Sequence, residues 1–474
     1  MRVRPLLITA AFIFGAGLVA CRPIAPPPSP APPSLPTLPA FTPPKWMSAS
    51  LDGIIQARPV FVPGTPDVVV VATENDSLYG FEASTGDPLW GPVSIGTAEP
   101  LSEVQALDPT NLDGCGDLDP LGITSNPVFD PVSGDVYAVG ERESTTLVGL
   151  NHVPEHVIVG INPVTGHVDL TPTPIDPPAM TVAGVNEVEA QQQRAGLAAA
   201  NGKVYVGFGG DSNDCGPYHG FVVGVNESDG SIAGSFEAAN LSGDRQAAVW
   251  APGGLAIDAA GNVYAATGNS PAQTEPPVDY SIAVVKLPST LGATPTDYFQ
   301  PSTWAGDNAG DLDLGTSSPL LVSAGSQVFQ IGKRGSGYLL STSSLGTPVS
   351  ELDGVCASFG STATLGASVF VPCQGSSMKQ VAINGSGSSA TLSAGWRSPS
   401  NVHASGPAVA DPVSNLVWSV DTASSVLYGI NPANGDAAVR GQLSLNGAEH
   451  FPTPTVGGGL VFVESNNQVE AFPT

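Results

Sequence analysis

Positive charge is scarce in this sequence, in which 15 Lys and Arg residues stand against 42 Asp and Glu for a formal net charge of −27. A field of this sign repels nucleic acid and anionic lipid headgroups, so the composition argues against a nucleic-acid partner. Charged residues of both signs make up only 12% of the chain, whereas Gly (56) and Pro (46) are abundant. This composition is typical of many strands joined by tight turns and excludes long surface helices.

Recognisable catalytic motifs are also missing. The sequence contains no G-x-S-x-G nucleophile elbow and no G-x-x-x-x-G-K-[ST] phosphate loop. His152-x-x-Glu155-His156 matches the letters of the inverted zinc-protease motif, which needs one helical face to bring both imidazoles onto the metal. Pro154 lies between the histidines, and the flanking residues are typical of strands. We therefore expect a polar hairpin loop here and not a zinc site.

The chain does contain a repeat. Its first copy is residues 68–90, VVVVATENDSLYGFEASTGDPLW. A β-branched run is followed by a turn at ND, a second strand, a turn at STG and a third strand ending on Trp90. Degenerate copies of this unit recur along the rest of the chain. A repeat of this kind outweighs the expectation, from length alone, of about three separate domains.

The copies predict an all-β fold, an eight-bladed β-propeller spanning residues 45–474. The first strands of the eight blades begin near Pro59, Pro127, Gly196, Gly254, Pro319, Thr362, Pro407 and Pro454. The last copy has no outer strand of its own, and Lys45–Leu51 resembles one. We expect this N-terminal strand to complete the eighth blade, because a linear array would leave sheet edges open.

The N-terminus is predicted to be a targeting segment. Residues 1–20 carry two arginines followed by an apolar core too short to span a bilayer comfortably, as in a signal peptide. The sequence LVAC at 18–21 resembles the lipobox of bacterial lipoproteins, which implies that Cys21 is lipidated. The alternative is an ordinary secretory signal in which Cys21 is incidental.

The residues after Cys21 bear on where the protein is held. Arg22 is not the aspartate that retains enterobacterial lipoproteins at the inner membrane, so the resemblance implies lipid anchoring at the outer membrane or cell surface. Residues 21–44 are Pro-rich and have few bulky side chains, so they cannot build a core. We expect an extended tether over this range.

The sequence LYGFEASTGDPLW is similar to the repeat of quinoprotein-like propellers of the pyrroloquinoline-quinone type, whose blades carry an Ala-Leu-Asp-Ala-x-Thr-Gly-x-x-x-Trp-like ending. The resemblance covers residues 45–474 and implies the propeller fold, because the motif serves blade-to-blade docking. Trp90 keeps the motif in the first blade, whereas other copies replace the tryptophan, for example with Leu170. The family includes periplasmic dehydrogenases and non-catalytic envelope lipoproteins that act as scaffolds for outer-membrane protein assembly.

In the dehydrogenases of this family the quinone stacks on a disulfide between adjacent cysteines, with Ca²⁺ and a catalytic aspartate nearby. This sequence has no two adjacent cysteines. The resemblance therefore favours a non-catalytic protein whose propeller binds an envelope protein or a small ligand, with no cofactor expected. A divergent oxidoreductase that uses pyrroloquinoline quinone and Ca²⁺ is the alternative.

The four cysteines after Cys21 are expected to pair in an exported protein. Four cysteines allow three connectivities, and the blade alignment selects one of them. Cys356 and Cys373 both belong to the sixth blade, whereas Cys115 precedes the second blade and Cys215 follows the second strand of the third. We predict the pairs Cys115–Cys215 and Cys356–Cys373; four free, buried thiols are the alternative.

Two groups of polar residues are candidates for a ligand site at one mouth of the central channel. The first group belongs to the sequence GDLD, which occurs twice and supplies Asp117, Asp119, Asp311 and Asp313. Their carboxylates could hold Ca²⁺ or could form hydrogen bonds within turns. The second shares one register before the first strands of successive blades and comprises Gln192, Trp250, His403 and His450, with Glu449 beside the last. Polar groups that satisfy one another in a wet channel are the alternative interpretation of this register.

Overall fold

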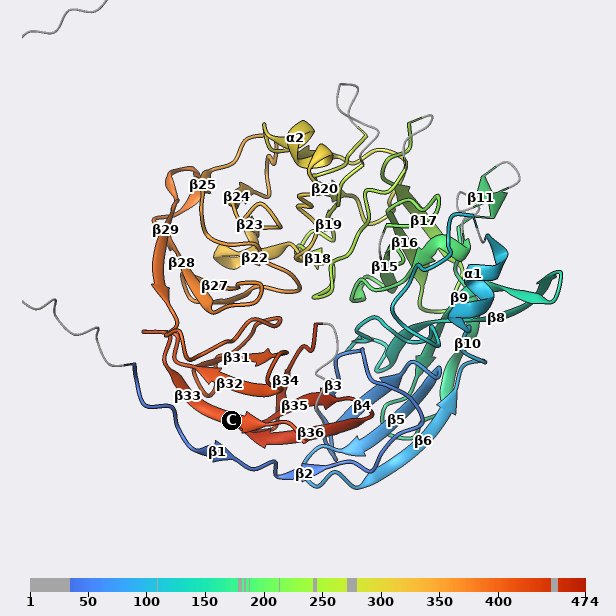
Figure 1. Ribbon diagram of the computed structural model, residues 1–474, viewed down its shortest axis with the longest axis horizontal. Coiled ribbons are helices and arrows are strands. Elements are labelled where there is room, and N and C mark those ends of the chain that lie inside the picture. Colours follow the sequence, from blue (N-terminus) through green and yellow to red (C-terminus); the bar gives the residue numbers. More distant parts are fainter. Residues whose placement is uncertain are drawn as a thin grey trace, which may run out of the picture. The chain divides into compact units, whose positions relative to one another are not determined.

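Short runs of β-branched and aromatic residues, separated by Gly, Asn, Asp and Pro, form strands along nearly the whole chain (Figure 1). The computed structural model describes residues 35–108, 110–177, 181–182, 185–186, 188–212, 214–241, 245–270, 279–444 and 451–474. Within the unit Pro36–Thr474, eight sheets surround a central axis, each built on four antiparallel strands, and two of them carry a fifth strand. The predicted eight-bladed propeller is confirmed.

Each of blades 1 to 4 is a meander whose first strand lies nearest the axis. Blade 1 contains β3 (Val60–Val62), β4 (Val68–Thr73), β5 (Ser77–Glu82) and β6 (Pro88–Ser94). Blade 2 contains β7 (Val128–Phe129), β8 (Val136–Val148), β9 (Asn151–Ile161) and β10 (Val168–Pro174). Blade 3 contains β14 (Ala198–Ala200), β15 (Lys203–Gly210), β16 (Phe221–Asn226) and β17 (Ile232–Glu237), with β13 (Gln191–Gln192) added to β15. Blade 4 contains β18 (Ala256–Ile257), β19 (Val263–Ala266), β20 (Val284–Leu287) and β21 (Asp297–Phe299).

Blades 5 to 8 continue the meander. Blade 5 contains β22 (Leu320–Val322), β23 (Gln327–Gln330), β24 (Gly337–Ser341) and β25 (Ser350–Leu352). Blade 6 contains β26 (Ala363–Leu365), β27 (Ser368–Pro372), β28 (Met378–Asn384) and β29 (Thr391–Arg397). Blade 7 contains β30 (Val409–Asp411), β31 (Leu416–Asp421), β32 (Val426–Ile430) and β33 (Ala437–Gln442), and blade 8 contains β34 (Thr455–Gly457), β35 (Leu460–Ser465) and β36 (Gln468–Pro473).

The innermost strands form a closed ring. Each contacts the innermost strand of the next blade, from β3 and β7 through to β30 and β34, and β34 contacts β3. All eight begin at or within two residues of the starts predicted from the repeat. The register of the repeat therefore fixes the position of every blade around the axis.

The ring closes through the predicted N-terminal strand. β2 (Trp46–Met47) pairs antiparallel with β36 and supplies the fourth strand of blade 8, as Figure 1 shows beside the C-terminal strands. Backbone hydrogen bonds from Lys45 N to Ala471 O (2.7 Å) and from Ser48 N to Val469 O (2.9 Å) extend the pairing. In the described part of the chain, the third strand of every blade is therefore paired with an outer strand.

Contacts with the propeller begin earlier than the predicted boundary at residue 45. β1 (Phe41–Thr42) pairs parallel with β33 as a fifth strand of blade 7. Arg440 lies over the Phe41 ring at 4.0 Å and donates to the carbonyl of Pro39 at 2.9 Å. The last part of the Pro-rich segment therefore packs on the propeller, because β1 pairs with the edge strand β33 and Phe41 contacts Arg440 of that strand.

Tryptophans join blades at the outer rim. Trp46, Trp90 and Trp396 each donate an indole N–H to a backbone carbonyl of the next blade, at 2.8–2.9 Å. Each ring lies against a turn glycine of that blade; a Cβ added at Gly166 would stand 2.7 Å from the Trp90 ring. Glycine is required here for two reasons: a side chain would collide with the Trp90 ring, and Gly166 has a φ of +72°, which other residues rarely adopt.

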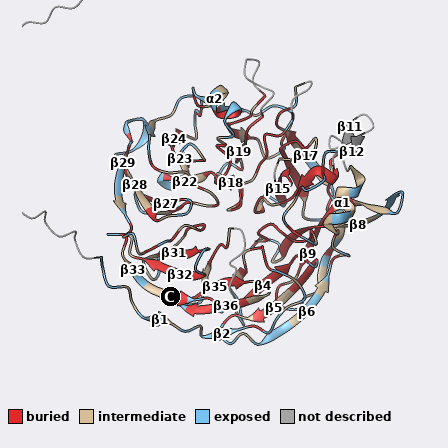
Figure 2. Ribbon diagram, viewed as in Figure 1, coloured by how far each residue is buried: buried red, intermediate tan, exposed pale blue. Residues whose placement is uncertain are grey.

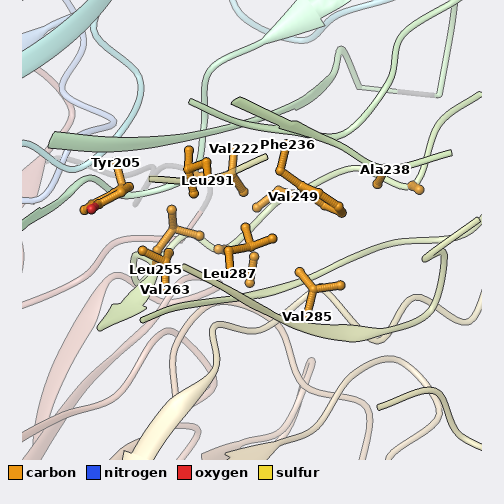
Figure 3. Close-up of a cluster of buried hydrophobic side chains, with 14 of the residues drawn as sticks. Tyr205, Val222, Phe236, Ala238, Val249, Leu255, Val263, Val285, Leu287 and Leu291 are labelled. Atoms are coloured by element: carbon orange, nitrogen blue, oxygen red, sulfur yellow. The ribbon is translucent and has the colours of Figure 1, made fainter. Parts of the chain in front are cut away.

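The hydrophobic core lies between neighbouring blades. Figure 3 shows one such cluster, in which Tyr205, Val222 and Phe236 of blade 3 face side chains of blade 4. Full burial of such a side chain contributes about 1.5–3 kcal/mol to folding. The second strands are buried on both faces, whereas outer strands such as β6 and β29 are largely exposed (Figure 2). Burial thus decreases from the axis to the rim.

Insertions between strands account for the remaining elements. They are α1 (Leu101–Leu107), α2 (Trp304–Ala309), a small pair formed by β11 (Thr181–Val182) and β12 (Val185–Asn186), and the single-turn helices η2 (Val188–Ala190), η3 (Ser323–Gly325) and η4 (Gly387–Ser389). In the described part of the chain, neither α-helix has the length and apolarity needed to cross a bilayer. The zinc-motif letters at His152, Glu155 and His156 fall in strand β9 of a long hairpin, and not in a helix. The prediction that these residues form a hairpin loop is wrong, because the turn of the hairpin lies before them at Gly149 and Leu150 and the pairing with β8 extends through them.

Candidate functional site

The connections at one end of the propeller line a cavity of about 340 Å³. Its wall comes from the segments that enter the first strands of blades 2 to 6 and 8 and from loops that follow second strands. These residues are Asp117, Gln192, Arg194, Asp211, Ser212, Asp214, Trp250, Pro252, Asp311, Asp313, Thr316, Lys333, Phe359 and Phe451. An antiparallel meander brings these two kinds of segment to the same end of each blade.

Five of the residues singled out from the sequence lie on this wall. They are Asp117, Gln192, Trp250, Asp311 and Asp313. Asp119 instead accepts a hydrogen bond from the backbone N–H of Leu101 (3.2 Å) at the start of α1, which is turn chemistry. The His403 side chain is exposed and contacts the carbonyl of Ser400 at 2.8 Å, so it does not line the cavity. Glu449 and His450 lie outside the described residues.

A disulfide fixes one side of the cavity. Cys115 and Cys215 are bonded across a sequence separation of 100 residues, with their Cα atoms 6.0 Å apart. The backbone N–H of Gly116 donates to the carbonyl of Ser212 at 3.2 Å and ties the same two segments together. Wall residues Asp117 and Asp214 lie two residues after one cysteine and one residue before the other. The bond therefore holds them in place.

The second disulfide lies within blade 6. Cys356 and Cys373 are bonded with a sequence separation of 17 and a Cα–Cα distance of 5.6 Å. Both predicted pairings are confirmed. Neither of these two cysteines lines the mouth cavity.

A lysine occupies the acidic pair on the blade 5 side of the cavity. Lys333 Nζ lies 2.7 Å from Asp311 Oδ1 and 2.7 Å from Asp313 Oδ2, while the backbone N–H of Asn269 donates to Asp313 Oδ1 at 2.6 Å. Burial opposes the charge of Lys333, but Asp313 and Asp311 outweigh it and raise the Lys333 pKa. For Asp313, burial raises the pKa, whereas the charge of Lys333 lowers it. We take Asp313 as ionised, because charge-assisted hydrogen bonds at this distance favour the charged forms of both groups.

This arrangement bears on metal binding. The echoed GDLD sequences do not converge, because Asp119 serves α1 and the second pair holds Lys333. Among the residues that the structure describes, no group of three or more His, Cys, Asp or Glu side chains is placed to share a metal ion. Of the predicted carboxylates, Asp311 and Asp313 thus form an ion-pair network with Lys333.

Trp250 supplies an aromatic face. Its ring lies against Gly209, where an added Cβ would stand 3.0 Å from the ring, and its Nε1 lies near Gly268. A Cβ at Gly268 would also stand 2.8 Å from Asp313 Oδ1, so the indole and this carboxylate are close neighbours. Across the cavity wall, the Arg194 guanidinium lies 5.2 Å from the centre of the Phe451 ring.

Behind Asp211, the wall continues into a buried ionic cluster of blades 1 to 3. His156 Nδ1 lies 2.7 Å from Asp176 Oδ1, and His156 Nε2 lies 3.4 Å from Glu141 Oε2. Burial disfavours the imidazolium, but Asp176 and Glu141 outweigh burial and raise the His156 pKa to about 10. Asp211 is 1% exposed, and burial, reinforced by Glu141, raises its pKa well above the usual range.

Further carboxyl groups in this cluster lack sufficient partners. Burial raises the pKa of Glu74 to about 7 and, together with Glu141, that of Glu99 to about 8. Both side-chain oxygens of Asp76 and of Glu99 are buried and accept no hydrogen bond. Such groups are retained in proteins chiefly in the protonated form, because an unpaired buried carboxylate is costly.

Sequence reasoning missed several wall and cluster residues, among them Glu74, Glu141, Asp211 and Lys333. Glu74, Asp211 and Lys333 come just after the end of a second strand of the repeat, and Glu141 lies within β8, the longest of these strands, at a comparable distance from its start. The same register that located the first strands would have found them, because the end of the second strand lies beside the start of the first in every blade. Phe451 and Arg194 carry no such signal.

Comparison with known proteins identifies the fold. No family model and no curated protein matches the chain by sequence. Among solved structures, BamB from Moraxella catarrhalis matches over 92% of this chain and 98% of its own, at 13% identity and a TM-score of 0.55. The quinohemoprotein alcohol dehydrogenase ADHIIG from Pseudomonas putida HK5 covers 92% of this chain and 76% of its own, at 13% identity and a TM-score of 0.61. A europium-containing methanol dehydrogenase covers 89% of this chain and 84% of its own, at 13% identity and a TM-score of 0.59. The chain thus has the quinoprotein-type eight-bladed propeller fold, which it shares with BamB and with these two dehydrogenases.

Proposed function

We propose that this chain is a non-catalytic binding protein of the cell envelope whose mouth cavity holds a small ligand. The cavity carries the proposal. Its volume of about 340 Å³ lies in the range of small-molecule sites, and three aromatic side chains and several charged groups line it. The Cys115–Cys215 bond preorganises the wall, which lowers the cost of ordering it on binding.

Anchoring and location belong to the same proposal. Residues 1–20 act as a signal peptide, Cys21 carries the lipid, and the Pro-rich residues that follow tether the propeller to the outer membrane or cell surface. Two disulfides support an extracytoplasmic location, since such bonds persist in oxidising compartments. Replacing Cys21 by Ser tests the anchor: the protein should leave the membrane fraction, and unchanged retention with normal processing would refute it.

Ligand binding is tested by thermal shift. Purified protein is screened against charged and aromatic small molecules, and a true ligand should raise the melting temperature by mass action. Trp250→Ala should abolish that rise, because the indole forms one face of the cavity. His403→Ala is the matched control, since this residue shares the register of Trp250 but does not line the cavity. A ligand whose effect is equal in both variants binds elsewhere.

An oxidoreductase is the second candidate function. The two dehydrogenase likenesses and the carboxylate of Asp313 beside Trp250 favour it. Trp250, Lys333 and Arg194 would suit an acidic aromatic quinone. The oxygen ligands that Ca²⁺ needs do not fit, because Asp311 and Asp313 are held by Lys333 and the described residues form no other metal group. We therefore derive no catalytic step.

An absorbance titration separates the two candidates. Adding pyrroloquinoline quinone with Ca²⁺ to the purified protein should leave the quinone spectrum unchanged if the chain is a binding protein for another ligand. A saturable spectral change that Trp250→Ala removes would favour the oxidoreductase.

A further inference from the structure

The charge of the mouth cavity is unbalanced. Five carboxyl groups line it, at Asp117, Asp211, Asp214, Asp311 and Asp313, against the two cations Arg194 and Lys333. Lys333 is already shared by Asp311 and Asp313, so that side of the cavity keeps one net negative charge. The remaining three acidic residues lie on the side held by the Cys115–Cys215 bond. This side therefore has more carboxyl groups than the other, and Asp211 among them is held protonated by burial until a cation binds beside it.

One of these carboxyl groups needs a donor. Asp211 is 1% exposed, and its Oδ1 accepts no hydrogen bond. Asp214 differs, because Tyr218 donates its hydroxyl to Asp214 Oδ1 at 2.6 Å. A buried acceptor without a donor destabilises the protein by the full cost of its desolvation. A ligand N–H group at this wall would remove that cost.

An aromatic face lies beside the same group. The Trp250 ring packs on Gly209, two residues before Asp211, and Tyr218 lies next to it with ring centres 6.4 Å apart. An ammonium group near an indole is attracted to the face of the ring. The apolar part of the same ligand can pack on the remainder of that ring. The geometry points to a protonated amine as the ligand of this cavity, with its N–H groups at Asp211 and its carbon skeleton against Trp250. This inference rests on the proposed ligand-binding function and names the chemical class of the ligand.

Three probes with one aromatic skeleton test the charge and the N–H donors separately. They are phenethylamine, its trimethylammonium derivative and 3-phenylpropionate, titrated by calorimetry into the full exported protein. The primary ammonium should bind tightest, the trimethylammonium ion more weakly because it has no N–H to donate, and the carboxylate not measurably. Tighter binding of the carboxylate would overturn the inference about charge while leaving the ligand-binding proposal in place. No binding of any probe would overturn the inference as well, and only a failed ligand screen would refute the proposed function.

Two variants locate the binding. Asp211→Asn should weaken binding of phenethylamine by about ten- to a hundredfold, the range for a hydrogen bond to a charged group. Trp250→Leu should weaken it by about two- to thirtyfold, the range for a cation near an aromatic face. His403→Ala should leave the affinity unchanged. Equal affinity in wild type and Asp211→Asn, with Asp211→Asn folded by circular dichroism, would overturn the inference.

The pH dependence gives an independent readout. The groups that face Asp211 are Glu141 and His156 of blade 2 and Asp117 of the cavity wall, and burial holds its carboxyl group protonated above the usual range. A bound cation favours the ionised form, so binding should release a proton and tighten as pH rises. Asp211→Asn should flatten this dependence. A dependence of opposite sign would contradict the placement of the amine.

Discussion

The outer rim and the channel mouth of this propeller are built by opposite rules. At the rim, Trp46, Trp90 and Trp396 repeat one contact, an indole on a turn glycine with its N–H on a backbone carbonyl of the next blade. At the mouth the described wall residues differ between most blades: an aspartate precedes blades 2 and 5, Trp250 precedes blade 4, and a phenylalanine precedes blades 6 and 8. Repetition therefore carries the architecture, and departures from it carry the site.

The largest expected effect comes from opening the ring. Deleting Lys45–Leu51 removes β2, exposes the edge of β36 and should destabilise all eight blades in one cooperative step. Circular dichroism during thermal unfolding measures the change. Deleting Pro26–Pro33 is the control and should leave the melting temperature unchanged; equal losses in the two deletions would contradict closure by β2.

The two disulfides differ in whether they join segments that carry residues of the cavity wall on both sides of the bond. Replacing both Cys115 and Cys215 by Ala should cost about 4.7 kcal/mol, and replacing Cys356 and Cys373 about 3 kcal/mol, by the loop-entropy estimate. Denaturant unfolding gives both free energies. The first pair should also weaken ligand binding, because its bond holds the cavity wall, and the second should not. Loss of binding in both variants would show that the Cys356–Cys373 bond also positions the cavity wall.

The rim contact itself is tested by a pair of glycines. Gly166→Ala and Gly202→Ala both place a side chain at a φ near +70°, which costs about 1–2 kcal/mol. Only at Gly166 does the new Cβ meet a ring, that of Trp90, whereas nothing lies within 4 Å at Gly202. Gly166→Ala should therefore be the more destabilising by about 1–3 kcal/mol in chemical denaturation, the range for overpacking. Equal losses would mean that the indole moves aside freely.

The smallest effect concerns pH. Glu74 and Glu99 have folded-state pKa values of about 7 and about 8, above those of an unfolded chain, so the folded protein binds more protons. Their contribution to stability is complete below the ordinary carboxyl pKa and is lost as pH rises through 7 to 8. Glu99→Gln should flatten this decline by up to about 1.4 kcal/mol per pH unit, measured by urea unfolding from pH 5 to 8. A steeper decline in the variant would reverse the assigned direction.

The sequence predicted the rim better than the mouth for a physical reason. Strand starts, the closing strand and both disulfides follow from a periodic pattern, because each blade must bury the same faces. Asp311 and Asp313 were identified as polar loop residues, but their partner Lys333 lies in another loop and no local pattern joins them. Leu170 shows a further limit. Leu170 pairs with a strand glycine, as Trp90 does in blade 1. The contact with the turn glycine Gly230 of the next blade, however, is made by Thr173, which the repeat alone does not indicate.

The closure of blade 8 also imposes an order on synthesis. Except for β1, every other blade strand follows β2 in the chain, and its partner β36 is the last of them. β2 must therefore wait without a partner until the whole ring has emerged, and a product cut short anywhere before β36 keeps two unpaired sheet edges. Such edges are templates for strand addition by other chains. An incomplete copy of this protein would accordingly be recognisable to quality-control machinery by its edges alone.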